Sequence, residues 1–216
     1  MKMQIKNTHY LILLILLVAT SAKAQEVENE FQTRTSVTLS TKLLKNLKVS
    51  ISPELRFDEN FALDKSLLEG NISYKLIKNL SLGAGLRFYA NKRETKSTEY
   101  YNRYLLSAKY DRSFGRFEPS LKISYTNFSD DDSDNNMLRY KAAVKYNIRK
   151  SKFTPFIGLE AFQETSGSDL YKMRYFVGTD YKICKKNYIE ASYKFDYFQN
   201  EFKNKHIVNI GYKLKF

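Results

Sequence analysis

Tryptophan is absent from the 216 residues, cysteine occurs once and proline three times, and residues after position 24 contain no apolar run of membrane-helix length. The lone Cys184 excludes an internal disulfide, and with no His or second Cys beside it the usual metal-ligand spacings are excluded as well. No stretch follows a helical period, which disfavours the helical fold classes. Acidic residues are a minority, at 23 against 36 Lys and Arg.

Met1 to Ala24 has the pattern of a secretory signal peptide. A basic start with Lys2 and Lys6 precedes an apolar run from Tyr10 to Ala19 and the small-residue ending Ala22-Lys23-Ala24. The run is well short of the ~20 residues of a spanning helix. We therefore expect cleavage after Ala24, without a lipid anchor because no cysteine stands there. A single mature domain, 25–216, would remain.

The mature chain would keep a surplus of positive charge, with 33 basic against 23 acidic residues. Export removes nucleic acid as a partner, and no basic helix or zinc pattern is present. Outer-membrane lipid and lipopolysaccharide are the expected anionic partners.

From Phe31 onward the sequence divides into eleven segments of about the length of a tilted membrane-spanning strand, each alternating apolar and polar residues. The predicted strands are Phe31 to Lys42, Leu47 to Phe57, Ser66 to Leu76, Leu80 to Ala90, Tyr100 to Asp111, Arg116 to Phe128, Met137 to Ile148, Phe153 to Phe162, Tyr171 to Lys182, Tyr188 to Tyr197 and His206 to Phe216. Short turns alternate with longer polar loops, and aromatic residues recur at both ends of the apolar face. This pattern predicts an all-β fold, an up-and-down antiparallel transmembrane β-barrel of 10–12 strands with short periplasmic turns and longer extracellular loops.

Two features fit this fold poorly. Eleven strands is an odd number, whereas single-chain bacterial barrels have an even number. Either Gln25 to Glu30 forms a short twelfth strand, or one segment does not span. Pro53, Pro119 and Pro155 lie within strands, where proline removes a ladder hydrogen bond, so we expect local bulges at these positions.

The last strand alternates up to an aromatic carboxy-terminus. Its outward residues are expected to form the insertion signal read by the barrel-insertion machinery: Val208, Ile210, Tyr212, Leu214 and Phe216.

The other face of the strands carries mostly positive charge. The predicted lumen-lining basic residues are Arg34, Lys48, Arg56, Lys75, Arg87, Arg103, Lys109, Lys122, Arg139, Lys141, Lys145, Arg174, Lys194, Lys213 and Lys215. The predicted lumen-lining acidic residues are Glu54, Glu69, Glu118, Glu160, Asp180, Glu190 and Asp196. The excess of cations in a narrow interior predicts that any permeation favours anions.

Several short motifs resemble an outer-membrane-barrel family of Bacteroidetes known as domain of unknown function 2490. The matching pieces are S-P-E-L-R-F-D-E-N at Ser52 to Asn60, G-A-G-L-R-F at Gly83 to Phe88, F-G-R-F-E-P-S-L at Phe114 to Leu121, and the closing I-G-Y-K-L-K-F. The resemblance implies an outer-membrane location and supplies no catalytic residue. The lack of Trp departs from the aromatic belts expected of that family.

The sequence predicts a non-enzymatic outer-membrane barrel with a mostly closed lumen, structural or a weak anion-preferring channel, with no catalytic residue, cofactor or metal. One alternative is an outer-membrane hydrolase using His206, oriented by Asp196 with Ser192 nearby. Another is a soluble periplasmic β-barrel that binds an apolar ligand. Asp130 to Asn136 offers alternating oxygen ligands but lacks the glycine and glutamate of a calcium loop, so a solvated extracellular loop is favoured over a divalent-ion contact to lipopolysaccharide.

Overall fold

A computed structural model describes residues 27–92, 97–127, 135–167, 170–199 and 202–216, and within these ranges it holds eleven strands. They are β1 (Glu28–Lys42), β2 (Leu47–Phe57), β3 (Leu63–Ile77), β4 (Leu80–Asn91), β5 (Glu99–Asp111), β6 (Phe117–Thr126), β7 (Met137–Tyr146), β8 (Phe153–Glu164), β9 (Leu170–Lys182), β10 (Asn187–Phe198) and β11 (Lys203–Lys215). No helix in these ranges has the length and apolarity needed to cross a membrane. The predicted signal peptide lies outside the described residues and stays a prediction.

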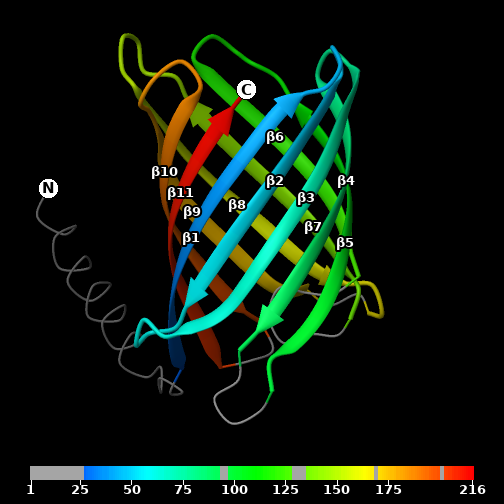
Figure 1. Ribbon diagram of the computed structural model, residues 1–216, viewed down its shortest axis with the longest axis vertical. Helices are drawn as coiled ribbons and strands as arrows, with labels where there is room; N and C mark the ends of the chain where they lie inside the picture. The colour runs from blue at the N-terminus through cyan, green and yellow to red at the C-terminus, as the bar shows by residue number, and fades with distance from the viewer. Residues whose placement is uncertain (1–26, 93–96, 128–134, 168–169, 200–201) are drawn as a thin grey trace, which may run out of the picture.

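The strands close into a single barrel (Figure 1). Each pairs antiparallel with its neighbour in sequence from β1 to β11, and the barrel is closed by β1 and β11, which run parallel from Glu28↔Lys203 to Ser40↔Lys215. Neighbouring strands of a meander alternate in direction, so with an odd number the first and last run the same way. Both sequence-based explanations of the odd count, a twelfth strand or a segment that does not span, are wrong. Glu28 to Glu30 extend β1 instead, and one ladder is parallel.

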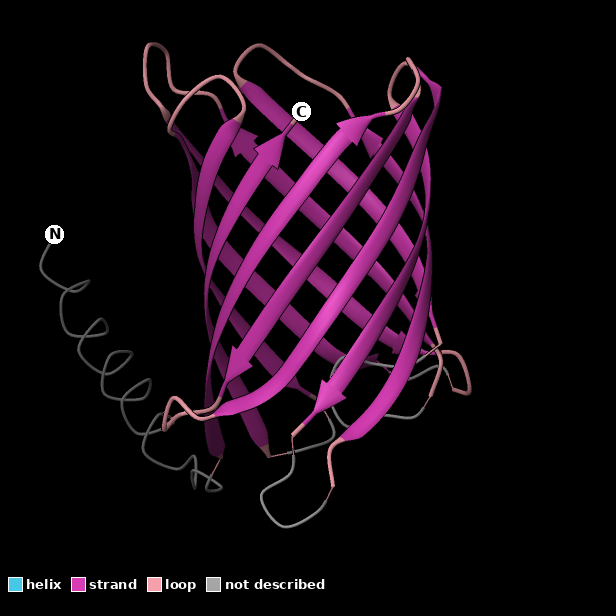
Figure 2. Cartoon of the chain, viewed as in Figure 1, coloured by secondary structure: helices cyan, strands magenta, loops and turns pink. Residues whose placement is uncertain are grey.

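The two ends of the barrel differ. We call the end with the connections 43–46, 78–79, 112–116, 147–152 and 183–186 the turn rim, and the end with 58–62, 92–98, 127–136, 165–169 and 199–202 the loop rim. Most strands reach further toward the loop rim than the sequence suggested, so several loops there are shorter than predicted. β1 begins at the loop rim, and β11 ends at the turn rim, beside the C-terminus (Figure 2).

The three strand prolines remain in register. Pro53 lies opposite Leu68, Pro119 opposite Val144 and Pro155 opposite Thr179. The register shifts fall elsewhere, at Arg56/Phe57, Lys75/Ile77 and Phe162/Gln163. The predicted bulges at the prolines are therefore wrong. The lost N–H donor interrupts or ends the pairing with the strand on the proline's other side without shifting its register: the β1–β2 pairs pass from Ser36↔Glu54 to Leu39↔Ile51, and the β5–β6 and β7–β8 ladders end at Ser120 and Phe156.

Apolar side chains cover the outside of the barrel. Exposed examples from different strands are Ile51, Leu86, Ile123, Ile157 and Ile210. Aromatic pairs lie outward near both rims. Near the turn rim, the ring centroids are 4.9 Å apart in Phe117–Tyr146 and 4.8 Å apart in Phe153–Tyr181. Toward the loop rim, those of Tyr104 and Tyr125 are 6.0 Å apart. Since side chains alternate across a strand, the same ladders turn the charged residues inward.

Candidate functional site: the basic lumen

The charges predicted to face the lumen converge on its interior. A cavity of about 370 Å³, here called the basic cavity, is lined by Arg34, Glu54, Arg56, Arg87, Lys109, Lys122, Arg139, Lys141, Lys145, Glu160, Arg174, Glu190 and Lys194, together with Ser120, Ala143, Phe156, Phe176 and Ser192. Lys48 and Glu69 line an adjoining cavity of about 460 Å³, which shares Lys109, Lys122 and Lys141 with the first. Arg103 borders a much smaller space.

The remaining predicted lumen charges lie around this space. Asp180 and Lys213 form ion pairs with residues of the basic cavity, and Asp196 does so with Arg174. Lys75, Glu118 and Lys215 are exposed near the turn rim.

Most of the cavity's cations are matched with a carboxylate. Glu160 accepts from Arg139 Nε at 2.9 Å, Glu54 accepts from Arg56 Nε at 2.8 Å, and Arg87 contacts Glu69. Asp180 accepts from Lys145 at 2.6 Å and from Lys213 at 2.8 Å, and Lys213 also contacts Glu190. Some of these pairs join neighbouring strands, Asp180 on β9 connects to β7 and β11, and the Glu54–Arg56 pair lies within β2. Together they fix the positions of the long side chains in the lumen.

Aromatic rings occupy places left by glycines inside the barrel. Gly158 lies opposite Phe176 and Gly178 opposite Phe156, and a Cβ built on either glycine would come within 2.6 Å of the facing ring. Each ring can therefore lie over the neighbouring backbone. Lys141 Nζ lies 4.5 Å from the centroid of the Phe176 ring, which places a cation against an aromatic face.

A layer of fully buried side chains fills the lumen near the loop rim. We call it the loop-side layer, and its nine members are Arg56, Tyr89, Thr126, Met137, Phe162, Lys172, Asp196, Phe198 and Ile207. They come from eight of the described strands, β2, β4 and β6 to β11, so the layer crosses the lumen. The rings stack with cations: Lys172 Nζ is 4.8 Å from the Phe162 centroid and 4.9 Å from the Phe198 centroid.

Asp196 is the electrostatic centre of the loop-side layer. It accepts from Arg174 Nε at 2.5 Å and Nη2 at 2.6 Å, and Lys172 Nζ lies 3.1 Å from its Oδ2. The side chains of Asp196 and Lys172 are both 0% exposed. Burying these charges away from water would be unfavourable if they were unpaired, and the contacts of both cations with the one carboxylate offset that cost.

Tyr89 forms a second centre in the layer. Its hydroxyl accepts from Arg87 Nη1 at 2.8 Å and from Arg103 Nη1 at 2.9 Å, and its ring stacks on Tyr101 with centroids 4.5 Å apart. Tyr89 on β4 and Asp196 on β10 thus fill the lumen near the loop rim from two different parts of the barrel wall.

The lumen is open at the other end. Near the turn rim the side chain of Lys145 is 43% exposed and that of Lys109 is 46% exposed. The interior is therefore a basic cavity that is accessible from the turn rim and is filled near the loop rim by the described side chains.

Of the residues that fill the lumen near the loop rim, sequence reasoning found Arg56 and Asp196 but missed most of the others. Lys172, Lys205 and Gln32 point inward and are buried, as are the apolar Phe162 and Ile207. A signal was available: on the inward face, apolar residues replace polar ones at the loop-rim end of β4, β8, β10 and β11. From the sequence alone, this break in alternation could equally mark the end of a strand. The structure shows that the strands continue to the loop rim.

The residues considered for hydrolysis are not brought together. His206 points outward, where its Nδ1 is hydrogen-bonded to the Tyr193 hydroxyl at 2.6 Å and its ring stacks on Phe31 with centroids 4.8 Å apart. Asp196 and Ser192 point into the lumen, and Asp196 is paired with Arg174. The barrel wall separates the histidine from the other two, because His206 lies opposite Phe195 and residues on either side of it face inward.

No cluster of three or more His, Cys, Asp or Glu side chains suited to a metal ion occurs in the described ranges. The acidic loop from Asp130 to Asp134 lies outside them, so its predicted solvated state stays a prediction. Cys184 is exposed in a turn and accepts a hydrogen bond from Asn187 Nδ2 at 2.9 Å.

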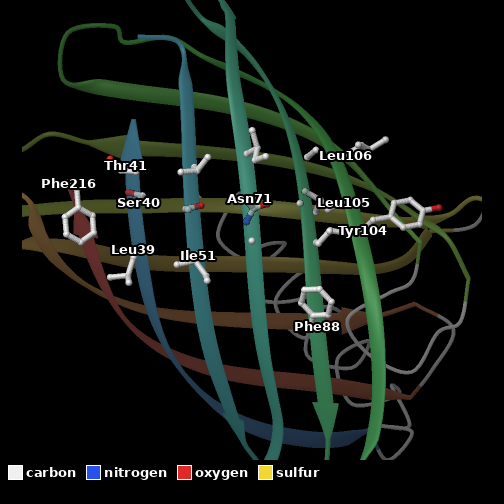
Figure 3. A pocket seen from close by; sticks show the side chains of 17 residues that line it. Leu39, Ser40, Thr41, Ile51, Asn71, Phe88, Tyr104, Leu105, Leu106 and Phe216 are labelled. Carbon is white, nitrogen blue, oxygen red and sulfur yellow. The ribbon is translucent and has the colours of Figure 1, made fainter. Parts of the chain in front are cut away.

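An apolar groove of about 710 Å³ lies on the outer surface over β1 to β5 and the end of β11 (Figure 3). Leu39, Ile51, Phe88, Leu106 and Phe216 contribute to its lining. The small residues Gly70 and Ala84 keep its floor low. Its lining is mostly apolar, in contrast to that of the lumen.

The fold and the lumen define the class of this chain as a closed, all-β barrel with a charged interior and an apolar exterior. A family model described as "Protein of unknown function (DUF2490)" matches residues 31–206, and the chain belongs to that family. A search of curated proteins found no match.

Proposed function

We propose that this chain is a non-enzymatic bacterial outer-membrane barrel whose lumen is closed near the loop rim. The observation that carries the proposal is the reversal of the usual arrangement: apolar side chains cover the outside and ion pairs fill the inside. A soluble barrel that binds an apolar ligand would need the opposite. In a bilayer the outer surface contacts hydrocarbon, and the closed ladder satisfies the backbone groups.

Strand length and ring placement support the same environment. The strands are 10 to 15 residues long, enough for the ~9 to 11 residues that cross a bilayer at a tilt. The outward aromatic pairs near each end occupy the levels at which interfacial belts are found. We place the turn rim toward the periplasm and the loop rim toward the cell exterior, because short turns are periplasmic and longer loops extracellular in such barrels. Lipopolysaccharide is then the expected neighbour of the barrel at the loop rim.

Membrane fractionation tests the location. The folded protein is expected in the outer-membrane fraction and should migrate anomalously on a gel until it is boiled. Recovery in the soluble fraction without a heat-dependent shift would sink the proposal.

The loop-side layer is the reason for proposing a closed lumen. Planar-bilayer recordings of the purified protein should show no steps above background. Replacing Phe162 and Phe198 together with Ala removes two rings from the layer and should produce small steps with anion preference, because the remaining lining is basic. The matched control is Phe153→Ala on the outer face, which should leave the protein silent. Cation-selective steps would contradict the assignment of the lumen.

A weak anion-preferring channel is the second candidate, favoured by the basic lining of the cavity. It requires the loop-side layer to move. Small anion-selective current steps from the unaltered protein would support this channel and contradict the closed lumen.

A further inference from the structure

The basic cavity holds more positive charge than its own residues neutralise. Its lining includes ten basic and three acidic side chains. Ion pairs account for several of the cations, as described above. Lys122, Lys141 and Lys194, however, form no ion pair with any residue in the part of the chain that the structure describes. All three line the same cavity, and they come from β6, β7 and β10.

The register explains why these charges are concentrated. Reading across the ladders from β1, directly opposed residues alternate in sign: Glu30, Lys205, Asp196, Arg174, Glu160 and Lys141. Beyond Lys141 the alternation stops. Lys122 lies directly opposite Lys141 on one side and Lys109 on the other. We call Lys109, Lys122 and Lys141 the lysine row.

The lysine row is unfavourable on its own. Directly opposed side chains on neighbouring strands have Cβ atoms ~5 Å apart, and like charges in such positions repel. Glu160, the acid opposite Lys141, is held by Arg139, and Asp111, which pairs with Lys109 at 3.2 Å, lies out at the turn rim. The centre of the row therefore needs negative charge from elsewhere.

Ser192 adds an independent observation. It is 8% exposed and lines the same cavity, and its Oγ has no hydrogen-bond partner in the described ranges. It lies two residues from Lys194 on the same face of β10. A buried hydroxyl without a partner, close to a lysine without an ion pair, matches the donors that an anionic group requires.

We propose that the basic cavity binds a small organic anion with at least two negative charges, of the phosphate or polycarboxylate class, which enters from the turn rim. Lys122 and Lys141 neutralise one charged group, Lys194 and Ser192 bind a second, and the rings of Phe156 and Phe176 contact the apolar part. The volume of about 370 Å³ is within the ~300 to 1,000 Å³ range of small-molecule sites. The site adds to the proposed function and rests on it only for the compartment, the periplasm, that supplies the ligand.

Calorimetry on the purified, folded full chain in detergent tests the site, with phenyl phosphate, inorganic pyrophosphate and citrate as separate probes. Phenyl phosphate and pyrophosphate represent phosphates, with and without a ring, and citrate represents polycarboxylates. At least one should bind saturably with one site per barrel, and binding should weaken as sodium chloride is raised. The probe that binds best identifies the class.

Matched variants assign the site. Lys122→Gln combined with Lys141→Gln should weaken binding about tenfold or more, because charge-assisted hydrogen bonds are lost. Ser192→Ala should weaken it by a smaller factor. The control Lys185→Gln removes an exposed lysine from a turn at the turn rim and should leave binding unchanged.

Lys122→Glu provides a second test that does not depend on the folding of the neutral variants. It supplies an acid between Lys109 and Lys141, so it should raise the unfolding temperature and abolish binding. Absence of binding by all three probes at millimolar concentration would overturn the proposal, and so would equal binding by the double Gln variant. Because these outcomes are read from folded protein in detergent, they leave the fractionation and conductance tests unaffected.

Discussion

Removing the carboxylate at the centre of the loop-side layer should be among the most damaging single changes in the barrel. Asp196→Asn keeps the size of the side chain but leaves Lys172 and Arg174 with a neutral amide. Lys172 is 0% exposed and its Nζ is 3.1 Å from the carboxylate, so water cannot take the place of the lost charge. Breaking a buried pair in this way costs about 3–5 kcal/mol.

The control is a solvent-exposed Lys–Asp ion pair of the same barrel. Asp111 pairs with Lys109 at 3.2 Å, and both side chains are about half exposed. Asp111→Asn should cost at most about 1 kcal/mol. The difference between the two variants isolates the effect of burial from that of losing a carboxylate.

Reversible urea unfolding of the protein in lipid vesicles, followed by heat-dependent gel migration, measures both free energies of unfolding. A third variant tests the cause. Replacing Lys172 and Arg174 with Met and Asp196 with Leu removes all three charges and should recover most of the stability, since buried ion clusters are often replaceable by apolar side chains. If Asp196→Asn lies within about 1 kcal/mol of the unaltered protein, the loop-side layer is wetter than the structure implies and the reasoning fails.

Three other changes test the faces of the wall. Ile210→Arg, outward at mid-strand, should cost about 2–4 kcal/mol of folding free energy in vesicles, whereas the inward Asn209→Lys should cost much less; equal costs would mean that the faces are exchanged. Deleting Phe216, which is 64% exposed and whose N–H donates to Ser40 O at 2.9 Å, should lower the amount of folded protein in the outer membrane, and unchanged amounts would remove it from the insertion signal. Gly158→Ala places a Cβ 2.4 Å from both a backbone oxygen and the Phe176 ring and should cost about 1–3 kcal/mol in urea unfolding, while Gly70→Ala, with open space around it, should be tolerated; similar costs would contradict the close packing.

The strand pattern was readable from the sequence because period-two alternation is a local property. Leu47, Val49 and Ile51 predict their own outward placement without knowledge of any partner. Closure is different, since it depends on how many strands stand between the first and the last. The sequence therefore predicted eleven strands but not the parallel ladder, and it treated the odd number as an error.

The lumen charges show the same limit. The sequence predicted their side of the wall and an excess of cations, but which cation meets which acid depends on register across strands far apart in the chain. Glu160 lies opposite both Lys141 and Arg174 yet accepts from Arg139, which alternation alone does not reveal. Lys205 was missed because the sequence assigned it to a loop, and Lys172 because it is only the second residue of the predicted strand Tyr171 to Lys182.

The parallel contact between β1 and β11 determines the order in which the wall can be completed. Parallel ladders have slanted hydrogen bonds and are slightly weaker per residue, and no tight turn can join strands that run the same way. Every other ladder can form as a hairpin, whereas β1 and β11 meet last, after the intervening strands have brought them together. In the proposed outer-membrane orientation, a tag placed before β1 would emerge on the opposite side of the membrane from one placed after β11. Of the two, only the tag before β1 would be within reach of antibodies added to intact cells.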